Sequence, residues 1–342
     1  MKRLLCLIIA TVAAAICARA DVRVLSIGIS SYPQESGWNS INGCNDADLV
    51  TSSFPNAVVL KDSAATHRGI SDALRRLLQR SAMAGDTVIV HFSGHGQQIV
   101  INHSENEPDG LDEAIVPYDA MKRKSASYSG VNHLTDNDFG KIIDSLRAKV
   151  GSAGLVIAVI DACHSDSMDK NPGEGKEVYR GTYEIFGAEN LTDNELNDLK
   201  RTYHNQDHSP ISRSPEMGNV VYLSACRSDQ RNYEIIAHGK GYGSLTYYFC
   251  KAYEVSGLTD MGEFLSAVYS GMEKDKTLRF HGQRPVFRNT LGWEAPEREA
   301  NRPVVFQPQP SDTTPYPAIA IITAGIIAVI LMILWTTKKR KR

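Results

Sequence analysis

Two segments of the sequence decide the fold and the candidate site. Residues 87–96 read Thr-Val-Ile-Val-His-Phe-Ser-Gly-His-Gly, and residues 155–165 read Leu-Val-Ile-Ala-Val-Ile-Asp-Ala-Cys-His-Ser. Each begins with a short, continuously apolar run, as in a strand of a parallel sheet that is covered on both faces. Each then ends in polar side chains, and ligands of such sheets gather beyond the carboxyl ends of the strands. Both segments therefore predict central strands that carry chemically active residues.

The rest of the chain repeats this pattern. Three further apolar runs predict strands, and they lie at residues 23–29, 57–60 and 220–223. Apolar residues also recur at helical spacing in four segments, at residues 70–78, 139–146, 245–252 and 261–268. Alternating strands and helices predict an α/β sandwich of three layers, with a mostly parallel central sheet flanked by helices. Residues 167–218 are polar and lack a clear period, so we interpret them as a long surface insertion.

Composition and charge exclude several classes of protein. The chain has 342 residues, of which 42% are hydrophobic and 22% are charged, which excludes disordered, collagen-like and disulfide-scaffold proteins. The net charge of -2 hides an acidic body. Eight of the 37 basic residues lie in the two ends, so residues 21–317 hold 29 basic against 39 acidic residues, a charge of -10. An acidic body argues against a nucleic acid partner.

The amino-terminal end predicts export. Residues 1–20 begin with Lys2-Arg3, continue with a short apolar run and end in Ala18-Arg19-Ala20. This is the pattern of a secretory signal peptide that is cleaved before Asp21. The alternative is an amino-terminal membrane anchor, for which the run is short.

The carboxyl-terminal end predicts a membrane anchor. Residues 318–335 are 18 residues without a charge, long enough for one transmembrane helix, and the tail at 336–342 is basic. Basic residues favour the cytoplasmic side, so we expect a cytoplasmic tail and an exported domain at residues 21–294, either periplasmic or extracellular. Residues 295–317 contain six prolines and read as an extended linker. The sequence thus predicts a single-pass membrane protein.

Cys163 and His95 predict nucleophilic catalysis. A cysteine directly after a buried strand is exposed at the sheet edge, and its thiolate is a strong nucleophile. His95, which lies between two glycines, can take the thiol proton and return it to a leaving amine. The amides of Gly96 and Cys163 would form the oxyanion hole. His164 is the poorer base because adjacent strand residues point to opposite sides, and His91 reads as a packed strand histidine. The alternative is that the Cys-His pair is structural.

Taken in order, these motifs resemble the caspase superfamily, specifically its metacaspase-like bacterial branch. The resemblance spans about residues 22–292 and includes four more motifs, at residues 42–47, 109–117, 223–230 and 241–246. It implies a caspase-like fold and a cysteine endopeptidase with Cys163 as nucleophile and His95 as its partner. No cofactor is implied for the chemistry itself.

The resemblance also implies the substrate and metal residues. Asp161 would line the pocket before the scissile bond and select Arg or Lys, forming a bidentate pair with a substrate guanidinium. Asp46 would be a second pocket acid, and Ser224 would lie on the strand end that borders the peptide. The alternative for Asp161 is that it only braces the catalytic loop. Metacaspases often need Ca²⁺, here at Asp112 and Asp136; the alternative is that these two are solvated loop and cap residues.

We therefore predict a membrane-anchored cysteine endopeptidase that cleaves protein substrates after Arg or Lys. It would also cut itself within residues 167–218, where Arg180 is followed by a glycine. The alternative is a catalytically inactive caspase fold that serves as a binding or scaffolding module at the cell surface. Asp166 favours this alternative, because a glycine usually follows Cys-His-Ser in the family.

Overall fold

The computed structural model describes residues 20–100, 111–163, 178–189, 191–192, 194–196, 211, 213–227 and 230–296. The described residues belong to one compact unit that ends at Pro296. The predicted signal peptide, transmembrane helix and basic tail, with nearly all of the linker, lie outside the described residues. Within the described ranges, no helix combines the length and apolarity that a membrane span requires.

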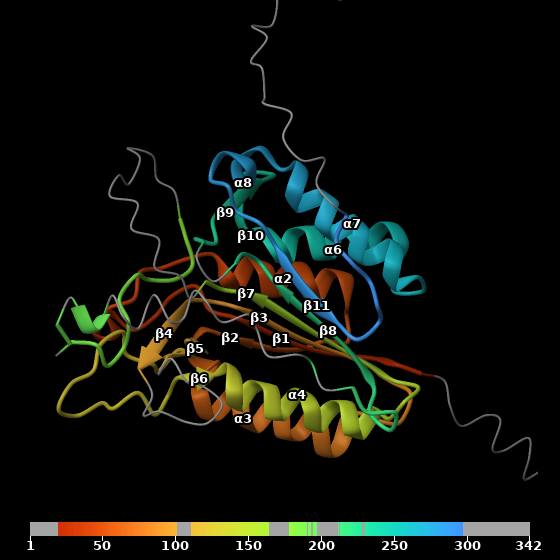
Figure 1. The fold of residues 1–342 in the computed structure, drawn as a ribbon, viewed down its shortest axis with the longest axis horizontal. Helices are drawn as coiled ribbons and strands as arrows, with labels where there is room; N and C mark the ends of the chain where they lie inside the picture. Colours follow the sequence, from red (N-terminus) through yellow and green to blue (C-terminus); the bar gives the residue numbers. More distant parts are fainter. Residues whose placement is uncertain are drawn as a thin grey trace, which may run out of the picture. The chain divides into compact units, whose positions relative to one another are not determined.

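A six-stranded sheet forms the centre of the fold, in the order β11-β8-β7-β3-β1-β2 (Figure 1). Neighbouring strands from β2 to β8 are parallel, and β11 is antiparallel to β8. The strands are β1 (Val22–Gly28), β2 (Val58–Lys61), β3 (Thr87–Ser93), β7 (Leu155–Asp161), β8 (Asn219–Ser224) and β11 (Val286–Asn289). The predicted mostly parallel sheet is confirmed, and β11 is an edge strand that the apolar runs did not indicate.

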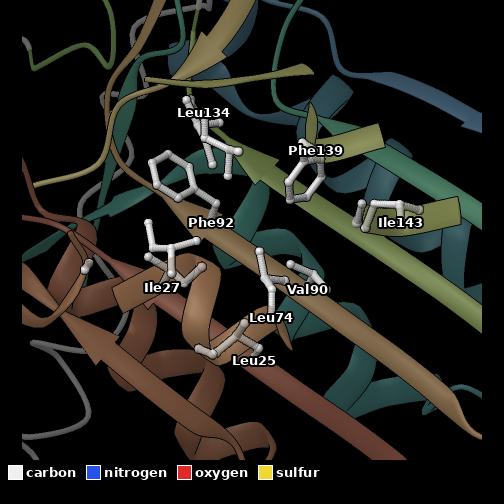
Figure 2. Packing of buried hydrophobic residues seen from close by; sticks show 14 of the residues in the cluster. Leu25, Ile27, Leu74, Val90, Phe92, Leu134, Phe139 and Ile143 are labelled. Atoms are coloured by element: carbon white, nitrogen blue, oxygen red, sulfur yellow. The ribbon is translucent and has the colours of Figure 1, made fainter. Parts of the chain in front are cut away.

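Helices cover both faces of this sheet. Successive strand residues point to opposite sides, so the apolar strands place hydrophobic side chains on both faces, and each face is buried against helices. On one face, Leu25 and Val90 of the sheet pack against Leu74 of α3 (His67–Arg76) and Ile143 of α4 (Asp136–Val150), as Figure 2 shows. On the other face, buried strand residues contact α2 (Gly43–Ser53), α6 (Ser244–Ser256) and α7 (Met261–Lys274). The three-layer sandwich that the sequence predicts is therefore present.

Smaller elements surround the carboxyl edge of the sheet. A three-stranded antiparallel sheet has the order β4-β5-β6, and β9 and β10 form a hairpin. These elements are β4 (Gly96–Val100), β5 (Leu111–Ile115), β6 (Leu134–Thr135), β9 (Glu234–Ala237), β10 (Lys240–Gly243) and the short helix α8 (Lys276–Phe280). Both β-structures build the walls of the candidate site.

The described part of residues 167–218 differs from the surface insertion that we expected. Arg180, Thr182 and Phe186 are buried. The backbone of Phe186 hydrogen-bonds to Gln98 and Val100 of β4 at 2.9 and 2.8 Å. The interpretation is therefore wrong for these residues: a polar segment without a period can still be buried when the site satisfies its polar groups.

Candidate active site

The register of the sheet places His95 and Cys163 at the same level. Ser93 of β3 pairs with Asp161 of β7. His95 comes two residues after Ser93, and Cys163 comes two residues after Asp161. Gly94, between Ser93 and His95 in the sequence, lies in a tight space, where a Cβ would come within 2.6 Å of the Phe92 ring. The two strand ends thus hold both side chains at one edge, as the sequence indicated.

His95 is held in one tautomer. Its Nε2 lies 2.9 Å from the carbonyl oxygen of Asn39, which can only accept, so Nε2 carries the proton. Its Nδ1 is buried and has no hydrogen-bond partner among the described residues. Trp38 stacks on the ring at 4.8 Å between centroids. Burial lowers the pKa of His95 to about 4, so the imidazole is neutral at pH 7 and Nδ1 is able to accept a proton.

Cys163 is buried, and its thiol donates to the carbonyl oxygen of Gln230 at 2.7 Å. The thiol of Cys226 lies 3.4 Å from the same oxygen. The hydrogen bond with Cys163, together with burial, raises the pKa of Cys226 well above its usual value, so Cys226 stays a neutral thiol. No disulfide joins the four described cysteines, which also include Cys44 and Cys250. His164, the alternative base, lies outside the described residues.

Residues 178–180 lie across this site like an extended peptide. The amide of Arg180 donates to the Asn232 carbonyl at 2.9 Å, and the amide of Glu234 donates to the Val178 carbonyl at 2.9 Å. The carbonyl oxygen of Arg180 accepts from the Cys163 amide at 2.7 Å, which is the contact expected of an oxyanion-hole donor. Gly181 packs so closely on this loop that a Cβ would lie 2.3 Å from the Cys163 carbonyl oxygen.

The side chain of Arg180 fills a buried acidic pocket. Its Nη1 lies 2.7 Å from Asp46 Oδ2 and 3.8 Å from Asp161 Oδ1, and it also donates to the Ser93 hydroxyl. Its Nε and Nη2 donate to Glu234 Oε1 at 3.2 and 2.9 Å. Burial lowers the pKa of Arg180, but the three carboxylates outweigh this and raise it, so the guanidinium stays charged. Asp46 and Asp161 both border this pocket, and their part in binding a substrate stays a prediction.

Arg180 does not form the bidentate pair with Asp161 that was predicted for a substrate guanidinium, and the pair with a substrate stays a prediction. Asp161 Oδ1 accepts from Asn232 Nδ2 at 2.7 Å, and Oδ2 accepts from the amide and hydroxyl of Thr246, both at 2.7 Å. Asp161 therefore braces the site as well as adding charge. Glu234 receives the two-nitrogen contact instead, and no sequence motif indicated it.

The other predicted site residues have different outcomes. Ser224 pairs with Val286 of β11, and the peptide-like segment runs along residues 232–234 instead. Gly96 is buried at the start of β4 and pairs with Ile115, so its part in the oxyanion hole stays a prediction. His91 is confirmed as a packed strand histidine: it is fully buried, and its ring nitrogens contact the hydroxyls of Ser26 and Thr246 at 2.9 Å.

The predicted calcium residues lie near the start of α4. Asp112 is buried; its Oδ2 accepts from Asn137 Nδ2 at 3.2 Å, and its Oδ1 has no hydrogen-bond partner among the described residues. Asp136 is the exposed first residue of α4. Over the described ranges, no three His, Cys, Asp or Glu side chains are grouped to hold a metal ion. The orphaned Asp112 oxygen fits a hard cation, and calcium binding stays a prediction.

Comparisons with known proteins agree with this architecture. The chain is 29% identical over 222 residues to Metacaspase-3 of Arabidopsis thaliana, which covers 64% of this chain and 52% of that protein. It is 28% identical over 267 residues to Metacaspase-1 of Schizosaccharomyces pombe, which covers 66% of this chain and 58% of that protein. The chain thus matches little more than half the length of these relatives.

A solved structure and a family model complete the comparison. The crystal structure of a protein from Geobacter sulfurreducens matches with a TM-score of 0.51 at 19% identity, over 82% of this chain and 96% of that one, which supports the fold alone. The family model described as the caspase domain matches residues 22–295. The chain therefore belongs to the caspase domain family.

Proposed function

We propose that this chain is a cysteine endopeptidase that cleaves peptide bonds after arginine or lysine, and that it first cuts itself between Arg180 and Gly181. One observation carries the proposal. The Arg180 carbonyl oxygen lies 2.7 Å from the Cys163 amide while its guanidinium occupies a pocket of three carboxylates. Membership of the caspase domain family and the relatives named metacaspases support a cysteine-type peptidase.

The geometry supports the following sequence of steps. The thiol of Cys163 turns from the Gln230 carbonyl and gives its proton to Nδ1 of His95. The thiolate attacks the carbonyl carbon of Arg180, and the Cys163 amide stabilises the negative charge on the oxygen. His95 then returns the proton to the nitrogen of Gly181, the C–N bond breaks, and water hydrolyses the thioester.

Two features favour an enzyme over an inactive binding module. A scaffold needs no buried base, yet the hydrogen bond from His95 to Asn39 leaves Nδ1 with an available lone pair. A scaffold also needs no substrate-like contact at the thiol loop, yet the Arg180 carbonyl has one. Asp166, which favoured the scaffold in the sequence, lies outside the described residues.

The self-cleavage is tested with the full-length chain. Purified wild type should yield a fragment whose first residue is Gly181, identified by mass spectrometry, and Cys163→Ala should stay intact. Cys250→Ala is the matched control, because this buried thiol belongs to the hydrophobic core around α6 and not to the end of β7, and its loss should not affect the cut. Because the segment belongs to the same chain, the rate should not depend on protein concentration. Equal fragmentation of wild type and Cys163→Ala would show that another protease makes the cut.

Export, membrane anchoring and calcium activation are also part of the proposal. The signal at residues 1–20, the apolar stretch at 318–335 and the basic tail at 336–342 support a single-pass protein with an exported domain. Protease added to intact cells or spheroplasts should degrade the domain and spare the tail. Asp112 and Asp136 would hold Ca²⁺, which would offset their charge beside β5 and α4; no step of the cleavage runs through the ion.

A further inference from the structure

The nitrogen atoms of Arg180 divide between two sides of the pocket. On one side, Nη1 contacts Asp46 at 2.7 Å and Asp161 at 3.8 Å. On the other side, Nε and Nη2 both donate to Oε1 of Glu234, at 3.2 and 2.9 Å. The pocket therefore uses the whole planar fork of the guanidinium rather than a single charged point.

A lysine in the same place could satisfy only one of these sides. Its ammonium is a compact point charge at the end of an unbranched chain, whereas arginine presents its donors in a rigid fork. The Asp46 side has the larger charge and the Ser93 hydroxyl, which itself donates to Asp46 at 2.7 Å. A lysine nitrogen should settle on this side, because two carboxylates attract it there. The Glu234 carboxylate would then lose both of its contacts with the substrate.

Glu234 is positioned independently of Arg180. The Asn42 amide donates to Glu234 Oε1 at 2.7 Å, and the Asn42 side chain donates to Oε2. Asn42 directly precedes the first residue of α2 as its N-cap, so a rigid element holds the carboxylate. A carboxylate fixed in this way recognises a side chain that fits it and loses interaction with one that does not.

We propose that Glu234 is the residue that makes this pocket select arginine over lysine. The proposal rests on the proposed peptidase function. It gives Asp46 and Asp161 a different role from that of Glu234. Asp46 and Asp161 attract any cationic side chain, whereas Glu234 reads the Nε and Nη2 donors that only arginine has.

The self-cleavage reaction offers a direct test in the full-length chain. Four chains are compared in one time course: wild type, Arg180→Lys, Glu234→Gln and the double variant. Hydrogen bonds to a charged partner are strong enough that losing the Glu234 contacts should slow the cut about ten- to hundredfold. Arg180→Lys should show this loss because it removes the contacts. Glu234→Gln should show a smaller loss, about five- to tenfold, because its amide oxygen can still accept from Arg180 but carries no charge. The double variant should be within about threefold of Arg180→Lys alone.

Asp46→Asn supplies the matched control, because it removes one charge from the other side of the pocket without changing its shape. It should slow self-cleavage of the Arg180→Lys chain as well as of the chain that keeps Arg180.

Two peptides that differ only in arginine or lysine before the scissile bond test the same selectivity with separate substrates. Unfolding midpoints in the Cys163→Ala background verify that each variant is folded. Glutamine keeps an oxygen for the Asn42 amide, so Glu234→Gln should fold.

The outcomes separate this inference from the function on which it rests. If Arg180→Lys is cut as fast as wild type, or if Glu234→Gln lowers cleavage after lysine as much as after arginine, Glu234 does not select between them. If wild type is not cut but hydrolyses the arginine peptide, self-processing fails and the ratio of the two peptides still tests Glu234. A wild-type chain that cuts neither its own segment nor either peptide overturns both proposals.

Discussion

Replacing Gly243 by alanine should distort the acidic pocket and leave the rest of the domain folded. Gly243 has φ −64° and ψ 135°, a conformation that alanine adopts freely, and its amide hydrogen bond to Asp46 would be kept. The added Cβ would lie 2.2 Å from Asp161 Oδ2 and 2.5 Å from Arg180 Nη1. Neither separation is tolerated between non-bonded heavy atoms, so both groups, or the Gly243 backbone itself, must shift.

The hydrogen bonds around the pocket indicate which of the two groups moves further. Asp161 is held by Asn232 and by both donors of Thr246, whereas the guanidinium is the far end of a long side chain. We therefore expect Arg180 to lose its contact with Asp46. Breaking a buried charge pair by removing one partner's contact costs about 2–5 kcal/mol. If the contact is kept in the transition state, this corresponds to a loss of roughly thirty-fold to several thousand-fold in the rate of cleavage after arginine.

The assay follows self-cleavage of the full-length chain at residues 180–181 and hydrolysis of an arginine peptide. Gly140→Ala is the matched control, because a Cβ at this position in α4 meets nothing within 4 Å. Gly140→Ala should cleave at the wild-type rate, and both variants should keep the far-ultraviolet circular dichroism of the wild type. If Gly243→Ala cleaves after arginine as fast as wild type, the pocket that holds Arg180 is not the pocket that binds substrate.

Three further predictions concern neighbouring groups. Burial lowers the pKa of His133 to about 4 in the folded chain. Between pH 6.5 and 4 the unfolded chain therefore binds more protons than the folded chain, and the free energy of unfolding decreases as the pH is lowered. His133→Gln should remove about 2 kcal/mol of this loss between pH 7 and 4.5, measured by urea unfolding; an unchanged pH dependence contradicts it. If Ca²⁺ binds at Asp112, it should accelerate self-cleavage of wild type but not of Asp112→Asn, and an equal response excludes this ligand. Cys226→Ala should cut itself within about threefold of wild type, because the raised pKa keeps Cys226 neutral; a loss above about tenfold would assign it a part in catalysis.

The central strands and the Cys-His pair could be predicted because each rests on a local pattern. Strand β7 is apolar from Leu155 to Ile160, and β3 is apolar from Val88 to Phe92 except for His91, since helices cover both faces of these strands. Their carboxyl ends are at the same edge of the sheet, so His95 and Cys163 had to be near each other. Strand β4 carries the buried polar residues Gln97 and Gln98, which conceal its pattern. Strand β11 is a short edge strand with only intermediate burial.

The remaining site residues depend on contacts that no local pattern carries. Asn39 orients His95 through its backbone carbonyl, so its side-chain identity gives no signal. Glu234 comes from a hairpin 188 residues beyond Asp46, and hydrogen bonds from Asn42 to Glu234 and from Gly243 to Asp46 bring the two together. Arg180 lies in a polar segment without a period, and it is buried because three carboxylates replace the water that an exposed guanidinium would have.

The buried position of Arg180 among three carboxylates has two consequences, one for the stability of the uncut chain and one for access to the site. Asp46, Asp161 and Glu234 are almost inaccessible to solvent, and burial raises the pKa of Asp46 to about 7 even with a guanidinium beside it. Removing the cation would leave like charges together in a buried space, so Arg180 stabilises the pocket of the uncut chain. The same side chain occupies the space that a substrate arginine would need. On the proposed function, the first bond to be cut is therefore the chain's own, and other peptides can enter only after residues 178–180 have left the site.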